Sequence, residues 1–547
     1  ADVVDFVKNI QAKVNAQEGN TLPVSAFNEY VDGSTPSGSS AYEKRGIAVD
    51  IPIWQPDNCI QCNRCAYVCP HAVIRPIALT EEEAANAPEG MDMIDMIGMP
   101  NMKFSIAVSA YDCTGCGSCA NVCPGKKGEK ALVMGNMEAN AGKQDFFNYG
   151  TELPIKPEVV AKFKETTVKG SQFKQPLLEF SGACAGCGET PYAKLITQLF
   201  GDRMYIANAT GCSSIWGNSS PSTPYTVNPQ GRGPAWSNSL FEDNAEFGYG
   251  MLLAQNTIRE RLKASVEKLV ENGANDDVKA AAQEYLDTFS VGATNGTATD
   301  KLVKALEDCD CGCAERAELL KNKDFLAKKS QWIFGGDGWA YDIGFGGVDH
   351  VLASGQDINI MVFDTEVYSN TGGQSSKATK TGATAQFAAG GKETKKKDLA
   401  GIAMSYGYVY VAQIAMGADF NQTVKAIAEA EAYPGPSLII AYAPCINHGI
   451  KKGMSKAQTE EQLAVECGYW NNFRFNPEAE KKFTLDSKEP KGDYQEFLNG
   501  EVRYNALMRA NPEKAQRLFA QNEAEAMERY EYLKGLVNLY DGTAKED

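Results

Sequence analysis

The chain has 547 residues, 43% of them hydrophobic, enough to fill the cores of roughly two to four domains. Its 70 acidic residues outnumber 53 Lys and Arg residues, and the net charge of −17 disfavours a general attraction to nucleic acid or an anionic membrane. No stretch reaches the roughly 20 apolar residues of a transmembrane helix, and the start lacks the features of a signal peptide. We therefore expect a cytoplasmic globular protein.

Residues 1–50 are rich in Gly, Ser and Pro, which predicts an extended linker strap. The chain has 16 cysteines but only three histidines, so a metal site must be built mainly from thiolates. That composition favours iron–sulfur chemistry over mixed Cys/His zinc sites.

A cysteine pattern, Cys-x2-Cys-x2-Cys-x3-Cys-Pro, occurs twice within residues 51–150. In bacterial-type ferredoxins, three closely spaced cysteines bind one [4Fe–4S] cluster and the fourth crosses to the other cluster. Two zinc sites are the alternative, but zinc sites usually need only two Cys-x2-Cys pairs and do not require this four-cysteine spacing to occur twice. The predicted ligands are Cys59, Cys62, Cys65 and Cys123 for one cluster, and Cys69, Cys113, Cys116 and Cys119 for the other.

From about residue 170, β-rich apolar runs alternate with helical patterns, which predicts a doubly wound, mostly parallel sheet. The fold class is therefore α/β, with a small α+β ferredoxin-like domain in front of it. The strands are expected within 203–211, 332–338, 358–366, 408–415 and 437–445. We expect the α/β domain to cover 151–475, with a helical insertion at about 255–330 and a helical C-terminal extension at 476–547.

The stretch that begins WIFGGDG and ends DTEVYSNTGGQ reads as strand, turn, helix, strand. Asp337 ends the first strand and Thr365 follows the second, so both are expected at one edge of the sheet. Gly336 and Gly338 allow the backbone to approach a phosphate. A carboxylate, a hydroxyl and a backbone carbonyl near Val367 suit Mg²⁺. Together these motifs resemble the signature of thiamine diphosphate, a cofactor that attacks 2-oxo acids.

Four further cysteines come from three distant segments of the chain. Cys184 and Cys187 precede a helical stretch, whereas Cys212 and Cys445 follow expected strands, so all four can reach the edge that carries Asp337. The spacing is equally compatible with a third cluster, a structural zinc site, or a Cys184/Cys187 redox pair beside an inert Cys445. Thiamine chemistry favours the cluster, because it needs a one-electron acceptor nearby and zinc has no redox chemistry.

The strap, the doubled cysteine array and the motifs ACAGCGET, FGGDGWAYDIG, DTEVYSNTGGQ and APCINHG resemble pyruvate:ferredoxin (flavodoxin) oxidoreductases of the single-chain type, over nearly the whole chain. The resemblance implies that Cys184, Cys187, Cys212 and Cys445 bind the cluster next to thiamine diphosphate, and that Asp337, Thr365 and the Val367 carbonyl bind Mg²⁺. It implies catalytic roles for Cys212 and Asn370. The cofactor would be lined by Glu189, Cys212, Gly336, Asp337, Gly338, Trp339, Thr365, Glu366, Val367, Tyr368, Ser369 and Asn370.

The resemblance also implies an activity. It is the oxidative decarboxylation of pyruvate with coenzyme A to acetyl-CoA and CO₂, with electrons leaving singly through three [4Fe–4S] clusters to ferredoxin or flavodoxin, or the reverse reaction as a pyruvate synthase. The family's pyrimidine-binding domain lies in an N-terminal half for which this sequence offers no candidate. We therefore expect a carboxyl-terminal half, inactive alone, of a homodimeric enzyme. Another 2-oxo acid:ferredoxin oxidoreductase and a non-catalytic iron–sulfur electron-transfer protein are the alternatives.

Some residues stay outside this interpretation. The CDCGC stretch is spaced too tightly for the usual cluster, so surface thiols are expected at Cys309, Cys311 and Cys313, with a redox-sensitive or metal-binding loop as the alternative. Cys467 is expected to pack in a core. His71 and His350 are expected to be ordinary turn or helix residues, and His448 either lies near the site or is a polar loop residue.

Overall fold

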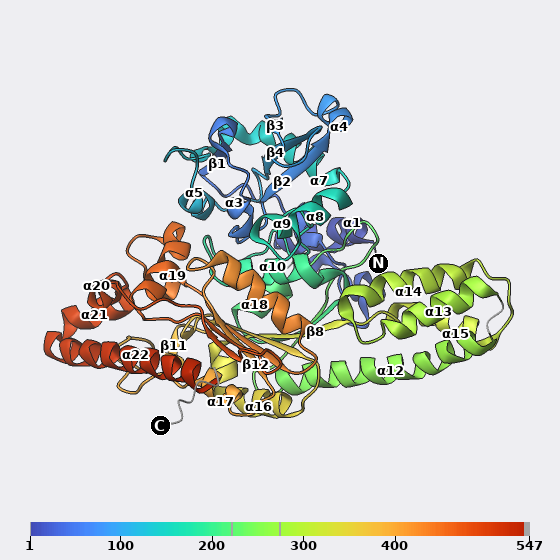
Figure 1. The fold of residues 1–547 in the computed structure, drawn as a ribbon. Coiled ribbons are helices and arrows are strands. Elements are labelled where there is room, and N and C mark those ends of the chain that lie inside the picture. The colour runs from blue at the N-terminus through green and yellow to red at the C-terminus, as the bar shows by residue number, and fades with distance from the viewer. Residues whose placement is uncertain (1, 220–221, 273–274, 541–547) are drawn as a thin grey trace.

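The computed structural model describes residues 2–219, 222–272 and 275–540 (Figure 1). Its centre is an eight-stranded sheet in the order β15-β14-β12-β13-β9-β8-β6-β7, which confirms the predicted α/β class. The parallel strands are β6 (Met204–Ala209), β7 (Ala235–Ser239), β8 (Ser330–Gly336), β9 (Asn359–Asp364), β12 (Tyr410–Ile414) and β13 (Ser437–Tyr442). The antiparallel strands at one edge are β14 (Phe473–Phe475) and β15 (Phe483–Leu485).

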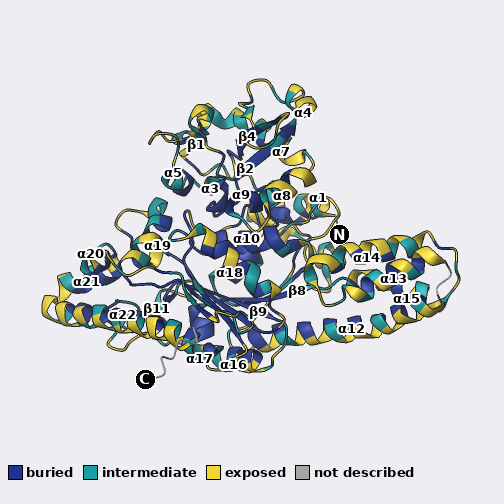
Figure 2. Cartoon of the chain, viewed as in Figure 1, coloured by how far each residue is buried: buried dark blue, intermediate teal, exposed yellow. Residues whose placement is uncertain are grey.

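Helices cover both faces of the sheet, because successive side chains of a strand point to opposite sides. Ile333 and Ile360 belong to the core that includes α16 (Phe345–Ala353) and α17 (Leu399–Met404). Their neighbours Phe334 and Met361 belong to the opposite core, with α10 (Thr190–Phe200) and α18 (Phe420–Ala432). Figure 2 shows the strands as the most continuously buried part of the molecule. Continuous apolar runs are the expected consequence of burial on two faces.

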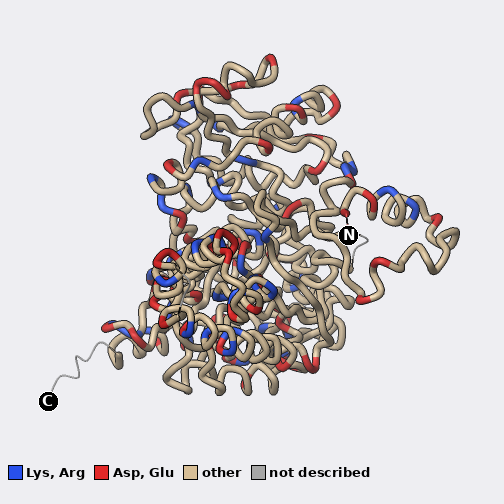
Figure 3. The backbone as a smooth tube through the Cα atoms, turned by 90° about the vertical axis from the view of Figure 1, so that its right-hand side faces the viewer, with Lys and Arg blue, Asp and Glu red and all other residues tan. Residues whose placement is uncertain are grey.

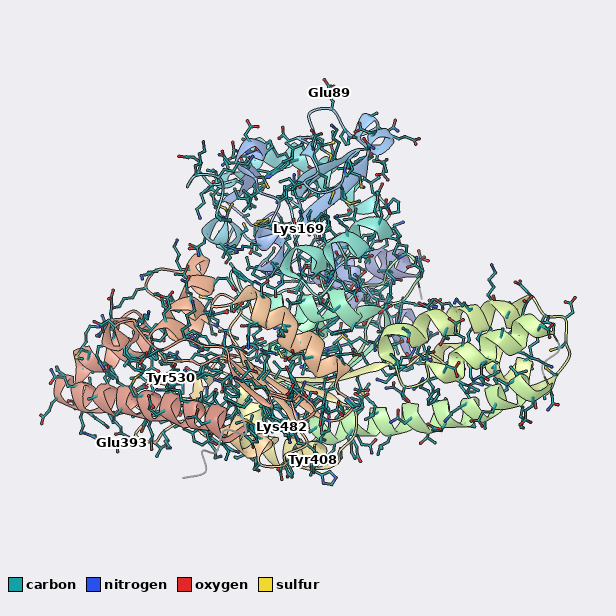
Figure 4. The ribbon with its side chains drawn as sticks, in the orientation of Figure 1. Glu89, Lys169, Glu393, Tyr408, Lys482 and Tyr530 are labelled. Carbon is teal, nitrogen blue, oxygen red and sulfur yellow. The ribbon has the colours of Figure 1, made fainter. Side chains whose placement is uncertain are left out.

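The ferredoxin-like part lies over the α10 and α18 side of the sheet (Figure 1). The Tyr67 hydroxyl donates to the Phe420 carbonyl at 2.9 Å, and the Asn121 amide donates to Thr459 at 2.8 Å. The Asn63 amide donates to the Lys169 carbonyl at 3.0 Å, and Figure 4 labels Lys169 beneath this part. Its elements are β1 (Asp50–Trp54), α3 (Arg64–Tyr67), β2 (Ile74–Thr80), α4 (Glu81–Ala85), β3 (Ile94–Asp95), β4 (Met102–Val108), α5 (Ser118–Val122), β5 (Leu132–Asn136), α6 (Met137–Asn140) and α7 (Gln144–Glu152).

A helical arm projects from one side of the sheet (Figure 1). It has its own apolar core, to which Leu262 and Leu302 belong. The arm begins earlier than the predicted residue 255, because the first turns of its long helix pack against β6 and β8, where Gly248 lies too close to Ile333 for a Cβ atom. Its helices are α12 (Asn244–Asn272), α13 (Asp276–Asp287), α14 (Gly292–Glu307) and α15 (Ala314–Lys321).

Both ends of the chain differ in detail from the expectation. Residues 3–15 are helical, because the Asp2 carboxylate caps the first turn and Phe6 and Ile10 are buried. The 476–547 segment contains β15 before its helices, since a three-residue strand is too short to show an alternating pattern. The remaining elements include α1 (Val3–Phe6), α2 (Ala12–Asn15), α8 (Pro157–Phe163), α9 (Val168–Ser171), α11 (Cys212–Ser214), β10 (Val367–Tyr368), β11 (Gln374–Ser375), α19 (Ala457–Glu466), α20 (Tyr494–Asn499), α21 (Val502–Ala510) and α22 (Pro512–Tyr540).

Acidic and basic residues are interspersed along the tube in Figure 3. In the described ranges, no helix combines the length and the apolar character that crossing a bilayer would require.

Glu461 on α19 is buried against the loop that follows β12. Its Oε2 accepts the Gly417 N–H at 2.7 Å and lies 3.2 Å from the Tyr192 hydroxyl. Burial raises the pKa of Glu461 from its ordinary 4.5 to about 8. The folded protein favours the protonated form of Glu461. This preference therefore contributes its full free energy of stabilisation below about pH 4.5, and the contribution is lost as the pH rises towards 8.

We expect Glu461→Gln to remove this loss, so that the variant becomes more stable than the wild type by roughly a few kcal/mol at pH 8. Thermal midpoints measured from pH 5 to 8 test this. The exposed Glu466 on the same helix supplies the control Glu466→Gln, which should follow the wild-type profile. Parallel profiles for wild type and Glu461→Gln would contradict the assignment.

Candidate functional site

Two small cavities in the ferredoxin-like part are lined by the sulfurs of the doubled array. Each takes three cysteines from one repeat and the last cysteine of the other. Cys59, Cys62, Cys65 and Cys123 line one cavity, and Cys69, Cys113, Cys116 and Cys119 line the other. The structure thus brings together both predicted sets.

Backbone N–H groups point at these sulfurs. Gln61 donates to Cys59 at 3.4 Å, Gly115 to Cys113 at 3.4 Å, and Ala131 to Cys123 at 3.3 Å. Such donors stabilise thiolates, the form that binds metal. Each cavity is thus surrounded by four sulfurs in the cross-ligated pattern of a bacterial-type ferredoxin, which fits a [4Fe–4S] cluster.

The four distant cysteines converge at the carboxyl edge of the parallel sheet. The loop of Cys187 and the loop of Cys445 touch where the Gly188 N–H donates to the Pro444 carbonyl at 3.1 Å. A Cβ atom at Gly188 would lie 2.6 Å from Pro444, so only glycine allows this approach. Nothing in the sequence around Gly188 indicates this contact.

These thiols lie close enough for the charge of one to affect the pKa of another. Burial raises the pKa of Cys445 to about 12, and the charges of Glu189 and Cys184 add to the effect. Burial likewise raises the pKa of Cys212, with additional contributions from Glu189, Cys187 and Cys445. The set therefore joins the Cys184 loop, the start of α11 and the loop after β13.

The three oxygens predicted for Mg²⁺ meet at this edge as well. The Thr365 hydroxyl lies 3.1 Å from Asp337 Oδ1 and 3.0 Å from the Val367 carbonyl. Asp337 is buried, and its Oδ2 accepts a hydrogen bond from Ser376 at 2.5 Å. Hard oxygens in this arrangement match the preference of Mg²⁺.

Glu366, between two of these donors, has a left-handed backbone with φ of 61°. This conformation costs a non-glycine residue about 1–2 kcal/mol. Contacts of the Glu366 carboxylate with buried partners offset this cost. The partners are Lys396 at 3.1 Å, Arg503 at 2.9 Å and the Tyr469 hydroxyl at 2.5 Å. Burial alone would raise the pKa of Glu366, but the charges of Lys396 and Arg503 outweigh it and lower the pKa. The network fixes the turn that presents the Thr365 and Val367 oxygens.

The β10–β11 hairpin connects the oxygen cluster to the sulfurs. The Ser369 hydroxyl lies 3.1 Å from the Cys212 sulfur, and the Asn447 amide donates to the Ser369 carbonyl at 3.0 Å. Asn370, predicted to be catalytic, lies next to Ser369 on the exposed turn, so it faces solvent while Ser369 makes the contact with Cys212.

The other predicted cofactor-lining residues surround the same edge. Glu189 is buried, accepts the Trp216 indole N–H at 2.8 Å, and has a pKa raised to about 7 by burial. Gly336 has open space on its Cβ side, apart from the Phe363 carbonyl at 3.9 Å. In contrast, Gly338 packs so closely on the Tyr368 ring that a Cβ atom would lie 2.4 Å away. Trp339 is buried behind this turn.

Two histidines have structural roles that spacing did not indicate. His448 is fully buried: its Nδ1 accepts the Cys445 N–H at 3.3 Å, and its Nε2 lies 2.6 Å from the Thr365 carbonyl. His71, expected to be an ordinary turn residue, is also buried, with Nε2 2.9 Å from the Ala183 carbonyl. Burial lowers the pKa of His71 to about 4, so both rings act as neutral connectors. His350 lies on α16, as expected of an ordinary helix residue.

Comparison with known families supports the two parts of the chain separately. Residues 58–127 match the family described as "4Fe-4S dicluster domain". Residues 317–441 match "Thiamine pyrophosphate enzyme, C-terminal TPP binding domain". Residues 1–48 match a domain of unknown function designated EKR. The chain therefore contains a 4Fe–4S dicluster domain and a thiamine diphosphate-binding domain.

The curated relatives span nearly the whole chain. It is 56% identical over 544 residues to pyruvate-flavodoxin oxidoreductase of Enterobacter agglomerans, covering 97% of this chain and 46% of the relative. It is 56% identical over 546 residues to pyruvate:ferredoxin oxidoreductase of Moorella thermoacetica, covering 97% and 46%. The mitochondrial pyruvate dehydrogenase [NADP(+)] of Euglena gracilis is 46% identical over 532 residues, covering 95% and 29%. The chain thus spans about half the length of the first two relatives and less than a third of the length of the third.

Proposed function

We propose that the chain forms the diphosphate-binding and electron-transfer half of a single-chain pyruvate:ferredoxin (flavodoxin) oxidoreductase. It is related to enzymes of this type over nearly its whole length. The complete reaction is the oxidative decarboxylation of pyruvate with coenzyme A to acetyl-CoA and CO₂. Electrons leave to ferredoxin or flavodoxin, and the same enzyme run in reverse is a pyruvate synthase. The observation that carries the proposal is the convergence of buried oxygens and four distant cysteines on one sheet edge.

In this proposal, Asp337, Thr365 and the Val367 carbonyl would hold Mg²⁺, which would neutralise the charge of the diphosphate of thiamine diphosphate. Gly336 leaves room for the diphosphate, and the buried ion pairs of Glu366 keep the turn in place. When bound, thiamine diphosphate supplies the carbon nucleophile that reacts with the 2-oxo acid. Cys184, Cys187, Cys212 and Cys445 hold a third [4Fe–4S] cluster, so that an electron acceptor lies beside the Cys212–Ser369 contact.

The remaining cofactor contacts, including those of the pyrimidine ring, come from protein outside these residues, since the chain covers 46% of relatives with this activity. Asn370 is exposed on its turn and is therefore accessible to a further part of the enzyme. We also propose that the complete enzyme is a homodimer.

Contacts between the two parts support an order of electron transfer. The backbone of Gly186, in the Cys184–Cys187 loop, lies near enough to Cys116 to lower the pKa of its thiol, which burial otherwise raises. His71 joins the same loop, through the Ala183 carbonyl, to Thr114, whose hydroxyl lies 3.4 Å from the other ring nitrogen. A cluster held by Cys69, Cys113, Cys116 and Cys119 would therefore be the middle carrier, and one held by Cys59, Cys62, Cys65 and Cys123 would be the outer one.

Iron content tests the proposed third cluster. Anaerobically purified chain should contain about twelve iron atoms, whereas Cys445→Ala should contain about eight, because one of three four-iron clusters loses a ligand. Iron and acid-labile sulfide assays, with electron paramagnetic resonance of the reduced protein, measure this. Cys467→Ser is the matched control, since Cys467 is buried with its sulfur 3.6 Å from the Ala464 carbonyl and should not affect iron. About eight iron atoms in the unmodified chain, or colourless protein with stoichiometric zinc, would refute the proposal.

A further inference from the structure

The CDCGC stretch forms the loop between α14 and α15, in the helical arm. The Cys311 and Cys313 sulfurs are 2.9 Å apart, about 0.9 Å more than a disulfide bond. Both side chains are partly exposed. The expectation of three surface thiols is corrected here, because Cys309 is 3% exposed and packs in the core of the arm.

The three thiols differ in their surroundings, so the loop is not a symmetric metal clip. The buried Cys309 sulfur accepts the Cys311 N–H at 3.3 Å, which holds the loop closed. Arg316, fixed by a 2.6 Å hydrogen bond to the Leu306 carbonyl, brings a positive charge near Cys311. No trio of Cys, His, Asp or Glu side chains in the described ranges, this trio included, can hold one metal ion.

The hydrogen bond from Cys313, together with the Arg316 charge, lowers the pKa of Cys311. The hydrogen bond shared with Cys311, followed by burial, raises the pKa of Cys313. A thiolate is the nucleophile in thiol–disulfide exchange. Cys311 therefore has the features of an attacking sulfur, and Cys313 those of the sulfur that completes the exchange.

We propose that Cys311 and Cys313 form a reversible dithiol–disulfide site that reacts with small-molecule disulfides. The Cys311 thiolate attacks one sulfur of R–S–S–R, forms a mixed disulfide and releases one RS⁻. The Cys313 thiolate then attacks the Cys311 sulfur, forms the Cys311–Cys313 bond and releases the second RS⁻. Two electrons pass from the protein thiols to the incoming disulfide, and the two thiol protons end on two RSH molecules. Cys309 stays reduced and supports the loop.

Anaerobic treatment of the full chain with oxidised glutathione tests this. Trypsin should release residues 305–316, which contain Cys309, Cys311 and Cys313 as their only cysteines. After the treatment and labelling of free thiols with N-ethylmaleimide, this peptide should carry one label, on Cys309, and a mass two hydrogens lower. Dithiothreitol before labelling should restore all three labels. The readout follows only this peptide, so it is independent of the iron–sulfur and thiamine sites.

Single variants separate the proposal from its competitors. Cys309→Ser should still form the disulfide, whereas Cys311→Ser should retain free thiols at Cys309 and Cys313. Circular dichroism verifies that each variant is folded. Three labels after treatment with oxidised glutathione, a bond that includes Cys309, or a glutathione adduct that persists on Cys311 without closing would each overturn the proposal.

Discussion

Changing Asp337 to asparagine is expected to weaken the binding of thiamine diphosphate in the presence of Mg²⁺ by at least ~100-fold, since outer contacts of a metal site alone are worth 10–100-fold. The Asp337 carboxylate is buried and lies within hydrogen-bond reach of Thr365 and Ser376. In the proposed site it would bind Mg²⁺ directly. The apoprotein should remain folded, because asparagine has the same shape and removes a buried charge that costs free energy. Isothermal titration calorimetry of the full chain with thiamine diphosphate, in the presence of Mg²⁺, measures the affinity.

Asp342→Asn is the matched control. Asp342 lies on the same turn but pairs with the exposed Lys377 at 2.8 Å, so its variant should bind as the wild type does. Titration with inorganic pyrophosphate and Mg²⁺ isolates the diphosphate contribution. Equal affinities for wild type and Asp337→Asn would show that the metal-binding oxygens were misassigned.

Arg503→Met is expected to cost about 3–5 kcal/mol of stability, the range for leaving a buried partner uncompensated. Arg503 is 3% exposed and pairs with Glu366 at 2.9 Å and Glu501 at 2.6 Å. Without it, Glu501 loses its main cation, Glu366 keeps only its lysine partners, and the left-handed turn at Glu366 loses one of its supports. Thiamine diphosphate affinity should fall as well. Denaturation followed by tryptophan fluorescence, combined with the titration above, measures both losses.

Two further variants show whether charge is the cause. Adding Glu366→Gln and Glu501→Gln to Arg503→Met should restore at least half of the lost stability, because buried amides need no counter-charge. Arg232→Met should cost only about 0–1 kcal/mol, since its pair with Asp300 is half exposed. A cost for Arg503→Met as small as that for Arg232→Met would contradict a structural role for the network.

The features predicted well from sequence are those in which local pattern carries the information. The doubled cysteine spacing indicates two cross-ligated sets because the fourth cysteine of each repeat is followed by proline. The convergence of Cys212, Cys445 and Asp337 could be anticipated because parallel strands end at a common edge. In each case a short motif and a topological rule were sufficient.

The features that sequence analysis missed depend on contacts between distant residues. Nothing near His448 indicates that its ring reaches the Thr365 carbonyl, and nothing near Arg503 indicates a partner at Glu366. Nothing in the sequence distinguishes Gly188 from other glycines, because its role depends on the close approach of Pro444. Three-residue strands such as β14 and β15 lack the length for a periodic signal.

The His448 bridge has a consequence for how the protein matures. One ring nitrogen binds the backbone of the Cys445 loop, and the other lies against the carbonyl of Thr365. Assembly of iron and sulfide at the proposed third-cluster site should therefore tighten a loop that also braces the turn proposed to hold the vitamin cofactor. We expect the two cofactors to load in sequence, iron before vitamin, so that freshly synthesised, iron-starved protein binds thiamine diphosphate poorly until its metal is supplied.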